Sequence, residues 1–114
     1  MQYHPEVSEA DVERIAHREF GAMEAGQALA ALRAYAGPEP HRTRLAVLKL
    51  AHGDPAALRR HLEAAILDWR DVLSEAEYPM ATKQLGRWAT MSEIERQQMF
   101  DADWSQYREW RDLP

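Results

Sequence analysis

The side chains in this sequence that are best spaced to do chemistry together belong to four aspartates. They form two close pairs, which are Asp68 with Asp71 and Asp101 with Asp103. Carboxylates that converge share a proton or hold a divalent cation, as in acid–base or metal chemistry. Their spacing matches no oxygen-ligand loop such as the calcium-binding hand. We favour a simpler role, in which these carboxylates are solvated at the surface or form ion pairs with Arg70 and Arg108.

The other groups able to attack a substrate or bind a cofactor show no catalytic spacing. Five histidines are scattered without an HxxxH pair or an HExxH signature, namely His4, His17, His41, His52 and His61. The chain contains no cysteine, which excludes disulfides and thiolate metal sites. No glycine-flanked serine, P-loop or GxGxxG loop is present. The sequence therefore favours a protein without catalytic residues, cofactor or metal.

Aromatic residues gather in the C-terminal part of the chain, where they are candidates for binding another protein. We expect Phe100, Trp104 and Tyr107 to pack against the long helix that precedes them. Trp110 does not lie on the helix face that these three residues share, so we expect its side chain to be exposed and available for contact. With the nearby carboxylates it defines a candidate interaction surface, consisting of Asp68, Asp71, Glu77, Tyr78, Asp101, Asp103 and Trp110.

The net charge of −5 bears on the class of partner. An acidic surface repels nucleic-acid phosphates, so binding of DNA or RNA is disfavoured. A short basic strip, made of His41, Arg42, Arg44 and Lys49, keeps nucleic-acid binding as a third alternative. No apolar run approaches the ~20 residues of a membrane span, and the N-terminus shows no secretory signal. We therefore expect a cytoplasmic protein with no membrane partner.

Two helices joined by a tight turn are the clearest structural prediction. Apolar residues recur at helical spacing over about 40–52 and about 55–77. Between them stand three residues with defined roles at helix ends. Gly53 suits the left-handed position that closes a helix, Asp54 caps the next helix, and Pro55 suits its first turn. We expect this hairpin to form the core, with a continuous apolar stripe from Leu58 to Ala76.

Further helices are predicted on both sides of the hairpin. One begins at Ser8, breaks near 24–27 and continues to Ala36, where Gly37-Pro38 ends it. Another begins after Ser92, which starts a capping box, or after Thr90, which offers an alternative start with Glu93. The segment 80–91 is the least determined, with one helical turn expected near 83–88.

These elements predict an all-α fold, in which residues 1–114 form one domain. The expected architecture is an irregular bundle of four to five helices built around the hairpin. The helix at 40–52 is apolar around nearly its whole circumference, so it must be covered. Two alternatives stay open, because either the rest of the monomer covers it or a second copy of the chain does so in a homo-oligomer.

Three segments resemble a group of small bacterial proteins with no assigned activity. These segments are Arg44–Asp54 (LKLA-x-GD), Asp68–Pro79 (RDVL followed by AEYP) and Ala102–Trp110 (DW-x-QY-x-x-W). They occur in the right order over roughly the C-terminal two thirds of the chain. The resemblance implies a bacterial origin and a shared helical fold, and it implies no activity.

These observations favour a small interaction protein that acts as an adaptor, regulator or inhibitor of a protein partner. The acidic surface and the spare aromatic side chains are the features that support it. The alternative is a carboxylate-based enzyme or metal-binding protein that uses the Asp68/Asp71 and Asp101/Asp103 clusters, with Tyr78 nearby.

Overall fold

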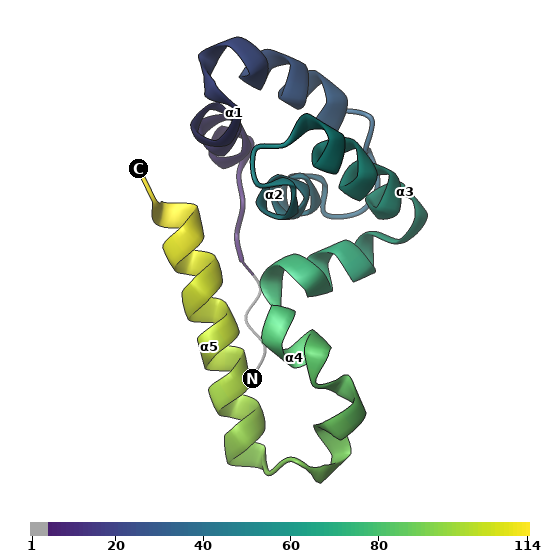
Figure 1. Ribbon diagram of the computed structural model, residues 1–114, viewed down its shortest axis with the longest axis vertical. Helices are drawn as coiled ribbons and strands as arrows, with labels where there is room; N and C mark the ends of the chain where they lie inside the picture. Colours follow the sequence, from purple (N-terminus) through teal and green to yellow (C-terminus); the bar gives the residue numbers. More distant parts are fainter. Residues whose placement is uncertain (1–4) are drawn as a thin grey trace.

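The computed structural model describes residues 5–114, and all six regular elements among them are helical (Figure 1). They are α1 (Glu9–Leu32), α2 (Pro40–Ala51), α3 (Pro55–Glu77), α4 (Pro79–Lys83), the 3-10 helix η1 (Leu85–Thr90) and α5 (Glu93–Asp112). This arrangement confirms the predicted all-α, single-domain fold.

The predicted hairpin is present, and α2 packs along α3. Its turn has two left-handed residues, His52 with φ 49° and Gly53 with φ 75°. A side chain at Gly53 would place its Cβ 2.7 Å from the carbonyl oxygen of Glu19, so glycine is needed there for two reasons. The Asp54 carboxylate accepts a hydrogen bond from the backbone N–H of Ala56 at 3.1 Å, as a helix cap does.

Helix α2 lies at the centre of the hydrophobic core, between α1 and α3. Its apolar side chains with at most 1% exposure are Leu45, Ala46, Val47, Leu48 and Ala51. Residues of α1, of α3 and the ring of Tyr107 on α5 belong to the same buried cluster. One copy of the chain therefore covers the buried face of α2.

Helix α1 bends at a different glycine from the expected one. The sequence predicted a break near 24–27, whereas the non-helical residue is Gly21, with φ 77° and ψ 168°. Lacking a Cβ, Gly21 adopts this conformation without steric cost, while Gly26 stays within the helix. The helix also ends at Leu32 rather than Ala36. Its start is as predicted, because Ser8 and Asp11 form a capping box.

Helix α3 is not one straight rod, so the prediction of a continuous stripe is wrong. Asp68 is extended, with φ −152° and ψ 94°, and divides the helix into two segments. Its carboxylate accepts a hydrogen bond from the N–H of Arg70 at 3.2 Å and so caps the second segment. Just before this kink, Leu67 is 89% exposed. The second segment leaves the hairpin and runs toward α4 (Figure 1).

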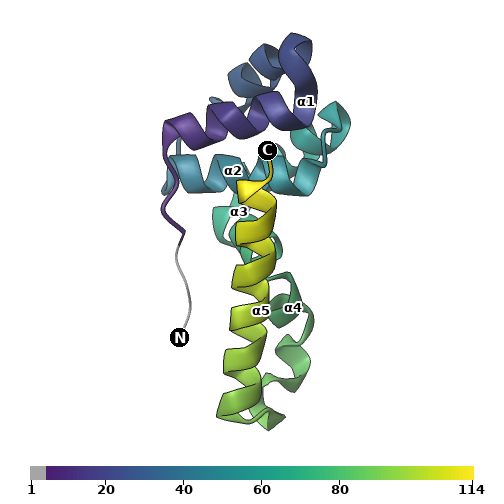
Figure 2. The ribbon, with the colours of Figure 1, turned by 90° about the vertical axis from the view of Figure 1, so that its left-hand side faces the viewer.

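The molecule has two parts, which we call the head and the foot. The head comprises residues 9–77 (α1, α2 and α3), and the foot comprises residues 78–102 (α4, η1 and the first half of α5). Helix α5 joins them, because its first half lies beside α4 and its second half reaches the head (Figure 2). The whole measures 47 × 30 × 21 Å.

Candidate functional site

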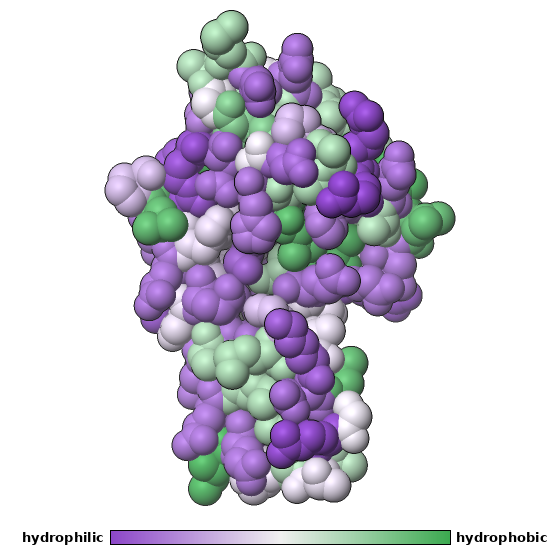
Figure 3. Space-filling view, viewed as in Figure 1, coloured by the Kyte–Doolittle hydropathy of each residue, from purple (hydrophilic) through white to green (hydrophobic). Residues whose placement is uncertain are grey.

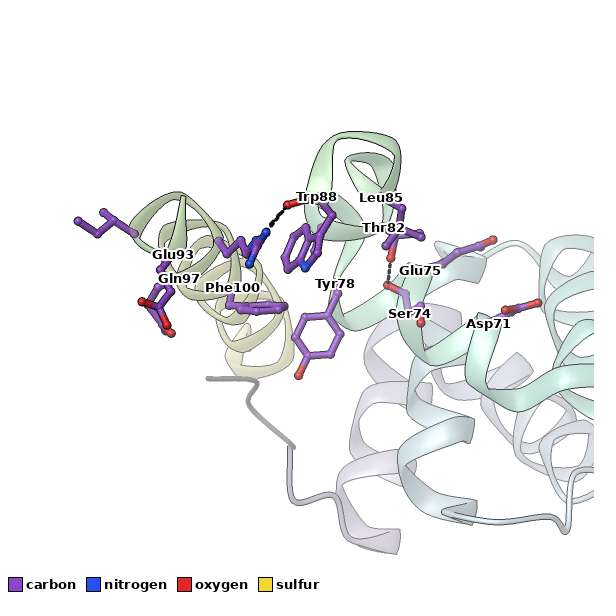
Figure 4. A pocket seen from close by; sticks show the side chains of 13 residues that line it. Asp71, Ser74, Glu75, Tyr78, Thr82, Leu85, Trp88, Glu93, Gln97 and Phe100 are labelled. Carbon is purple, nitrogen blue, oxygen red and sulfur yellow. Dashed lines mark hydrogen bonds between the residues drawn. The ribbon is translucent and has the colours of Figure 1, made fainter. Parts of the chain in front are cut away.

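A cleft of about 910 Å³ opens on the side of the foot that faces the end of α3, where α3, the α4–η1 segment and the first half of α5 meet. The three wall elements follow one another between residues 71 and 100 and converge on one group of rings (Figure 4). The cleft is lined by Asp71, Ser74, Glu75, Tyr78, Ala81, Thr82, Leu85, Trp88, Glu93, Ile94, Arg96, Gln97 and Phe100.

Three aromatic rings form the floor of the cleft. The ring of Phe100 on α5 lies between the two others, with centroids 5.8 Å from Tyr78 and 5.3 Å from Trp88. Both pairs are edge-to-face, at interplanar angles of 81° and 62°. This is a favourable geometry for aromatic rings, and it ties α3, η1 and α5 together through one residue.

Arg96 fixes the position of Trp88. Its guanidinium donates two hydrogen bonds to the carbonyl oxygen of Trp88, at 2.7 and 3.0 Å. It also lies 5.7 Å from the centre of the Trp88 ring, within the range of a cation–π interaction. The cation lining the cleft is thus engaged in holding η1 against α5.

The rim of the cleft is apolar and acidic. Leu85 is 68% exposed and Ile94 is 70% exposed, so two large aliphatic side chains stand in solvent. The carboxylates of Asp71, Glu75 and Glu93 are exposed beside them. Among the residues that the structure describes, these three carboxylates form no ion pair. Figure 3 shows apolar side chains among hydrophilic ones on the face of the foot turned to the viewer.

The buried carboxylate of Asp103 holds the foot on α5, which corrects its place in the predicted surface. Asp103 has no exposed area and accepts hydrogen bonds from the N–H groups of Met80 (2.9 Å) and Ala81 (3.0 Å). It therefore satisfies donors in the first turn of α4, which no helix can satisfy by itself. Lys49 is close enough for Asp103 to raise its pKa, but burial has the larger effect and lowers it.

Glu77 was also predicted to be free for interaction, and it is buried with 3% exposure. Its two carboxylate oxygens accept hydrogen bonds from Arg42 Nε at 2.7 Å and from the second guanidinium nitrogen at 2.5 Å. This bidentate bond is the main cause of the raised pKa of Arg42. The α2–α3 packing brings the pair together, so Glu77 belongs to the core of the fold.

Trp110, the predicted exposed contact, is partly buried against the hydrophobic core. The guanidinium of Arg18 lies 5.0 Å from its ring centre, and the Tyr107 ring lies 6.1 Å away. Arg18 also donates hydrogen bonds to the carbonyl oxygens of Trp110, Arg111 and Leu113, at 2.8, 3.2 and 2.9 Å. These contacts from α1 draw the end of α5 onto the head. Tyr107 is buried as expected, whereas Trp104 and Phe100 are only half-buried.

The four aspartates have four different environments. Asp68 caps the second segment of α3, Asp71 lies on the rim of the cleft, and Asp103 is buried under α4. Asp101 is exposed and accepts a hydrogen bond from the side chain of Gln97 at 2.9 Å. Within residues 5–114, no three histidine or carboxylate side chains are placed to hold a metal ion together.

The basic strip is largely used inside the protein. Arg42 binds Glu77, and Arg44 donates hydrogen bonds to the carbonyl oxygens of Leu32 and Tyr35 at distances of 2.7 to 3.2 Å. His41 is partly buried. His4 lies outside the described residues. These arginines thus fix the α1–α2 and α2–α3 packing.

Of the predicted interaction surface, Asp71 and Tyr78 are the residues that line the cleft. The predicted surface did not include most of the rim and floor, namely Glu75, Leu85, Trp88, Glu93, Ile94 and Phe100. One usable signal was present, because Leu85 and Trp88 flank Gly86 in a segment whose pattern predicted little helix. Apolar residues in such a segment have no helical face to bury them.

No helix among the described residues combines the length and the apolar character needed to cross a bilayer. No family model, curated protein or solved structure matches this chain.

Proposed function

We propose that this chain is a protein-interaction module and that the cleft in the foot binds its partner. The observation that carries the proposal is the exposure of Leu85 and Ile94 beside a floor of aromatic rings. Aromatic anchors surrounded by apolar surface are typical of the energetic centre of a protein interface. A contiguous apolar surface with a polar rim is also uncommon on a protein that acts alone.

The shape of the cleft favours a macromolecular partner over a small molecule. Pockets for small ligands enclose most of the ligand and place a few polar groups around it. Here the aliphatic side chains of the rim stand outward, and Arg96 is held by a backbone carbonyl. The cleft therefore offers a broad apolar contact area, which suits the surface of another protein.

A carboxylate-based enzyme gains no support from the geometry, because Asp68 and Asp103 are used as helix caps. The cysteine-free sequence suits a reducing compartment, and we expect the interaction to take place in the cytoplasm.

A capture experiment with matched variants tests the proposal. The protein is immobilised in three forms, wild type, Ile94→Glu in the cleft and Leu67→Glu at the kink of α3, and exposed to extract of the cells that naturally produce it. Both substitutions place a carboxylate at an exposed aliphatic position, so neither disturbs the core. We expect one stoichiometric partner on the wild type and on Leu67→Glu, and none on Ile94→Glu. Equal capture by all three forms, or no partner on any, contradicts the proposal.

A further inference from the structure

We infer that the occupant of the cleft is a helical segment of a partner protein, with an apolar face that enters the cleft and lysine or arginine beside that face. This inference rests on the proposed function, because it assigns the chemistry of the partner that the cleft would bind. Three properties of the cleft lead to it, namely the charge of its rim, the hydrogen bonding of its walls and its size.

The charge of the rim selects for a basic partner. Asp71 and Glu75 lie four residues apart on α3, so two like charges are neighbours on one helix face, an arrangement that destabilises a helix. Glu93 adds a third carboxylate from α5. The lining cation, Arg96, is bonded to the Trp88 carbonyl. Lysine or arginine on the partner would relieve this repulsion and accelerate association.

The walls of the cleft favour a helical occupant. They are built from α3, α4, η1 and α5, whose backbone groups are bonded within their own helices or, as at Met80, Ala81 and Trp88, to side chains of α5. No described strand edge is available to pair with an extended peptide. Backbone groups that leave water must still be hydrogen-bonded, so the occupant has to satisfy its own backbone. A helix does this, and it presents apolar anchors at i, i+3 or i+4, and i+7.

The size of the cleft agrees with such anchors. A volume of about 910 Å³ holds several side chains, more than one apolar anchor alone would fill. Each large aliphatic side chain buried there would favour binding, because its apolar surface leaves water. The aromatic floor supplies the flat contact surface, and Leu85 and Ile94 flank the entering face.

A second copy of this chain fits the cleft less well than a basic helix. A two-fold interface would bring the same patch of both copies together. The acidic rims would then lie near one another, in a molecule whose net charge is −5. Like charges that face each other across an interface are unfavourable.

Selection from a peptide library tests the inference with defined probes. A phage library of random helix-favouring peptides is selected on the full chain, with counter-selection on the Ile94→Glu variant. We expect the enriched peptides to carry apolar residues at helical spacing and more lysine and arginine than the unselected library. One enriched peptide is then synthesised, and its affinity is measured by fluorescence anisotropy. We expect binding to weaken about tenfold or more with Ile94→Glu and to be unchanged with Leu67→Glu.

Charge reversal gives the sharpest control. In the double variant Asp71→Lys with Glu75→Lys, the basic peptide should lose affinity, and a matched peptide with glutamate in place of lysine should gain it. Binding of the basic peptide to the wild type should also weaken as salt is added. Enriched peptides that are acidic, that lack helical spacing, or that bind Ile94→Glu equally well would each overturn the inference.

The two proposals fail in distinguishable ways. If the natural partner depends on Ile94 but binds through an acidic or extended segment, the proposed function stands and this inference is wrong. If neither partner nor peptide depends on Ile94, both are wrong. Sedimentation equilibrium that finds a wild-type dimer, lost in Ile94→Glu, would identify a second copy as the occupant and would also overturn the inference.

Discussion

The head and the foot are built from the same kind of helix but differ in how much apolar surface they bury. In the head, α2 is enclosed by α1, α3 and Tyr107, and its aliphatic side chains are almost wholly inaccessible. In the foot, Ala81 is the single buried residue among 78–102, all of which are described. The head therefore contains most of the core that stabilises the fold. The foot keeps its large apolar side chains available, as a surface for another molecule would.

The difference also shows in how acidic side chains are used. Glu77 and Asp103 lie where the head, α4 and α5 meet, and both are buried and hydrogen-bonded. Asp71 and Glu75, on the same α3 segment as Glu77, point away from the core and border the cleft. Side chains of one chemical type thus stabilise the junction or shape the binding surface, depending on which face of the helix carries them.

Removing the carboxylate of Glu77 should have the largest effect. In Glu77→Ala the guanidinium of Arg42 stays largely buried without its partner, which should cost about 3–5 kcal/mol of unfolding free energy. Asp71→Ala, on the cleft side of the same helix, should change it by less than about 0.5 kcal/mol. Urea denaturation of both variants measures the difference. Equal losses would remove the distinction between junction and cleft carboxylates.

Truncating aliphatic side chains compares the two regions directly. Leu48→Ala in α2 should cost about 2–5 kcal/mol, because it leaves a cavity in a closed core. Ile94→Ala in the foot should change stability by less than about 0.5 kcal/mol, since its side chain is mostly in water. Denaturant midpoints of the two variants provide the measurement. A large loss for Ile94→Ala would mean that the foot has a closed core of its own.

Asp103→Asn tests whether the foot is held separately from the head. An amide offers one acceptor oxygen and places an N–H₂ group near a backbone donor, so we expect a loss of about 1–3 kcal/mol. Hydrogen exchange should become faster at the amides of Met80 and Ala81 and stay slow at Leu48. Uniform acceleration over α2 and α4 would show instead that the two regions open as one unit.

A glycine in each region gives a matched pair of backbone tests. Gly53→Ala should cost roughly 1–2 kcal/mol for the left-handed conformation alone, before its contact with the Glu19 carbonyl is counted. Gly86→Ala meets open space and should stabilise the protein by about 0.4–1 kcal/mol through the unfolded chain. Melting temperatures of the two variants should shift in opposite directions.

The smallest effect should be a gain. The Tyr107 hydroxyl is buried without a hydrogen-bond partner among residues 5–114, so Tyr107→Phe should be neutral or stabilise the fold by up to about 1 kcal/mol. Burial raises the pKa of Tyr107. The contribution of its neutral side chain to the free energy of unfolding is therefore present below about pH 10 and is lost as the pH rises further. The advantage of Tyr107→Phe should therefore grow above that pH. Denaturation at pH 7 and at pH 10.5 measures it.

The predictions from sequence succeeded where the determining residues are close together in the chain. The turn at His52-Gly53-Asp54-Pro55 and the capping boxes at Ser8 and Ser92 are set by neighbours within four residues, and all are present. The bounds of α2 and α3 were accordingly predicted to within one or two residues. Local chemistry also explains why Ser92 starts α5, because its hydroxyl accepts a hydrogen bond from the Glu95 N–H and its own N–H donates one to the Glu95 carboxylate.

The predictions failed where a residue far away in the chain determines the environment of a side chain. Glu77 is buried because Arg42 meets it from 35 positions away, and Asp103 is buried because it binds the N–H of Met80, which lies 23 positions before it. Neither partner is evident from spacing. Gly21 and Gly26 have the same intrinsic freedom, so sequence does not choose between them as the bend in α1. The cleft was largely missed although its lining lies within residues 71–100, because spacing along the chain does not show how α3, η1 and α5 pack against one another.

The bonds that Arg18 donates to the end of α5 span 92 to 95 positions of the chain. During synthesis, α1, α2 and α3 emerge well before those carbonyl groups exist, and the α2–α3 hairpin forms through short-range contacts. The Arg18 guanidinium therefore stays solvated until the last turn of α5 has been synthesised and packs against α1. The cleft is lined by residues 71–100, so its walls emerge before the carbonyl groups that Arg18 binds, and the last turn of α5 then ties the part of the chain that carries the binding surface to α1.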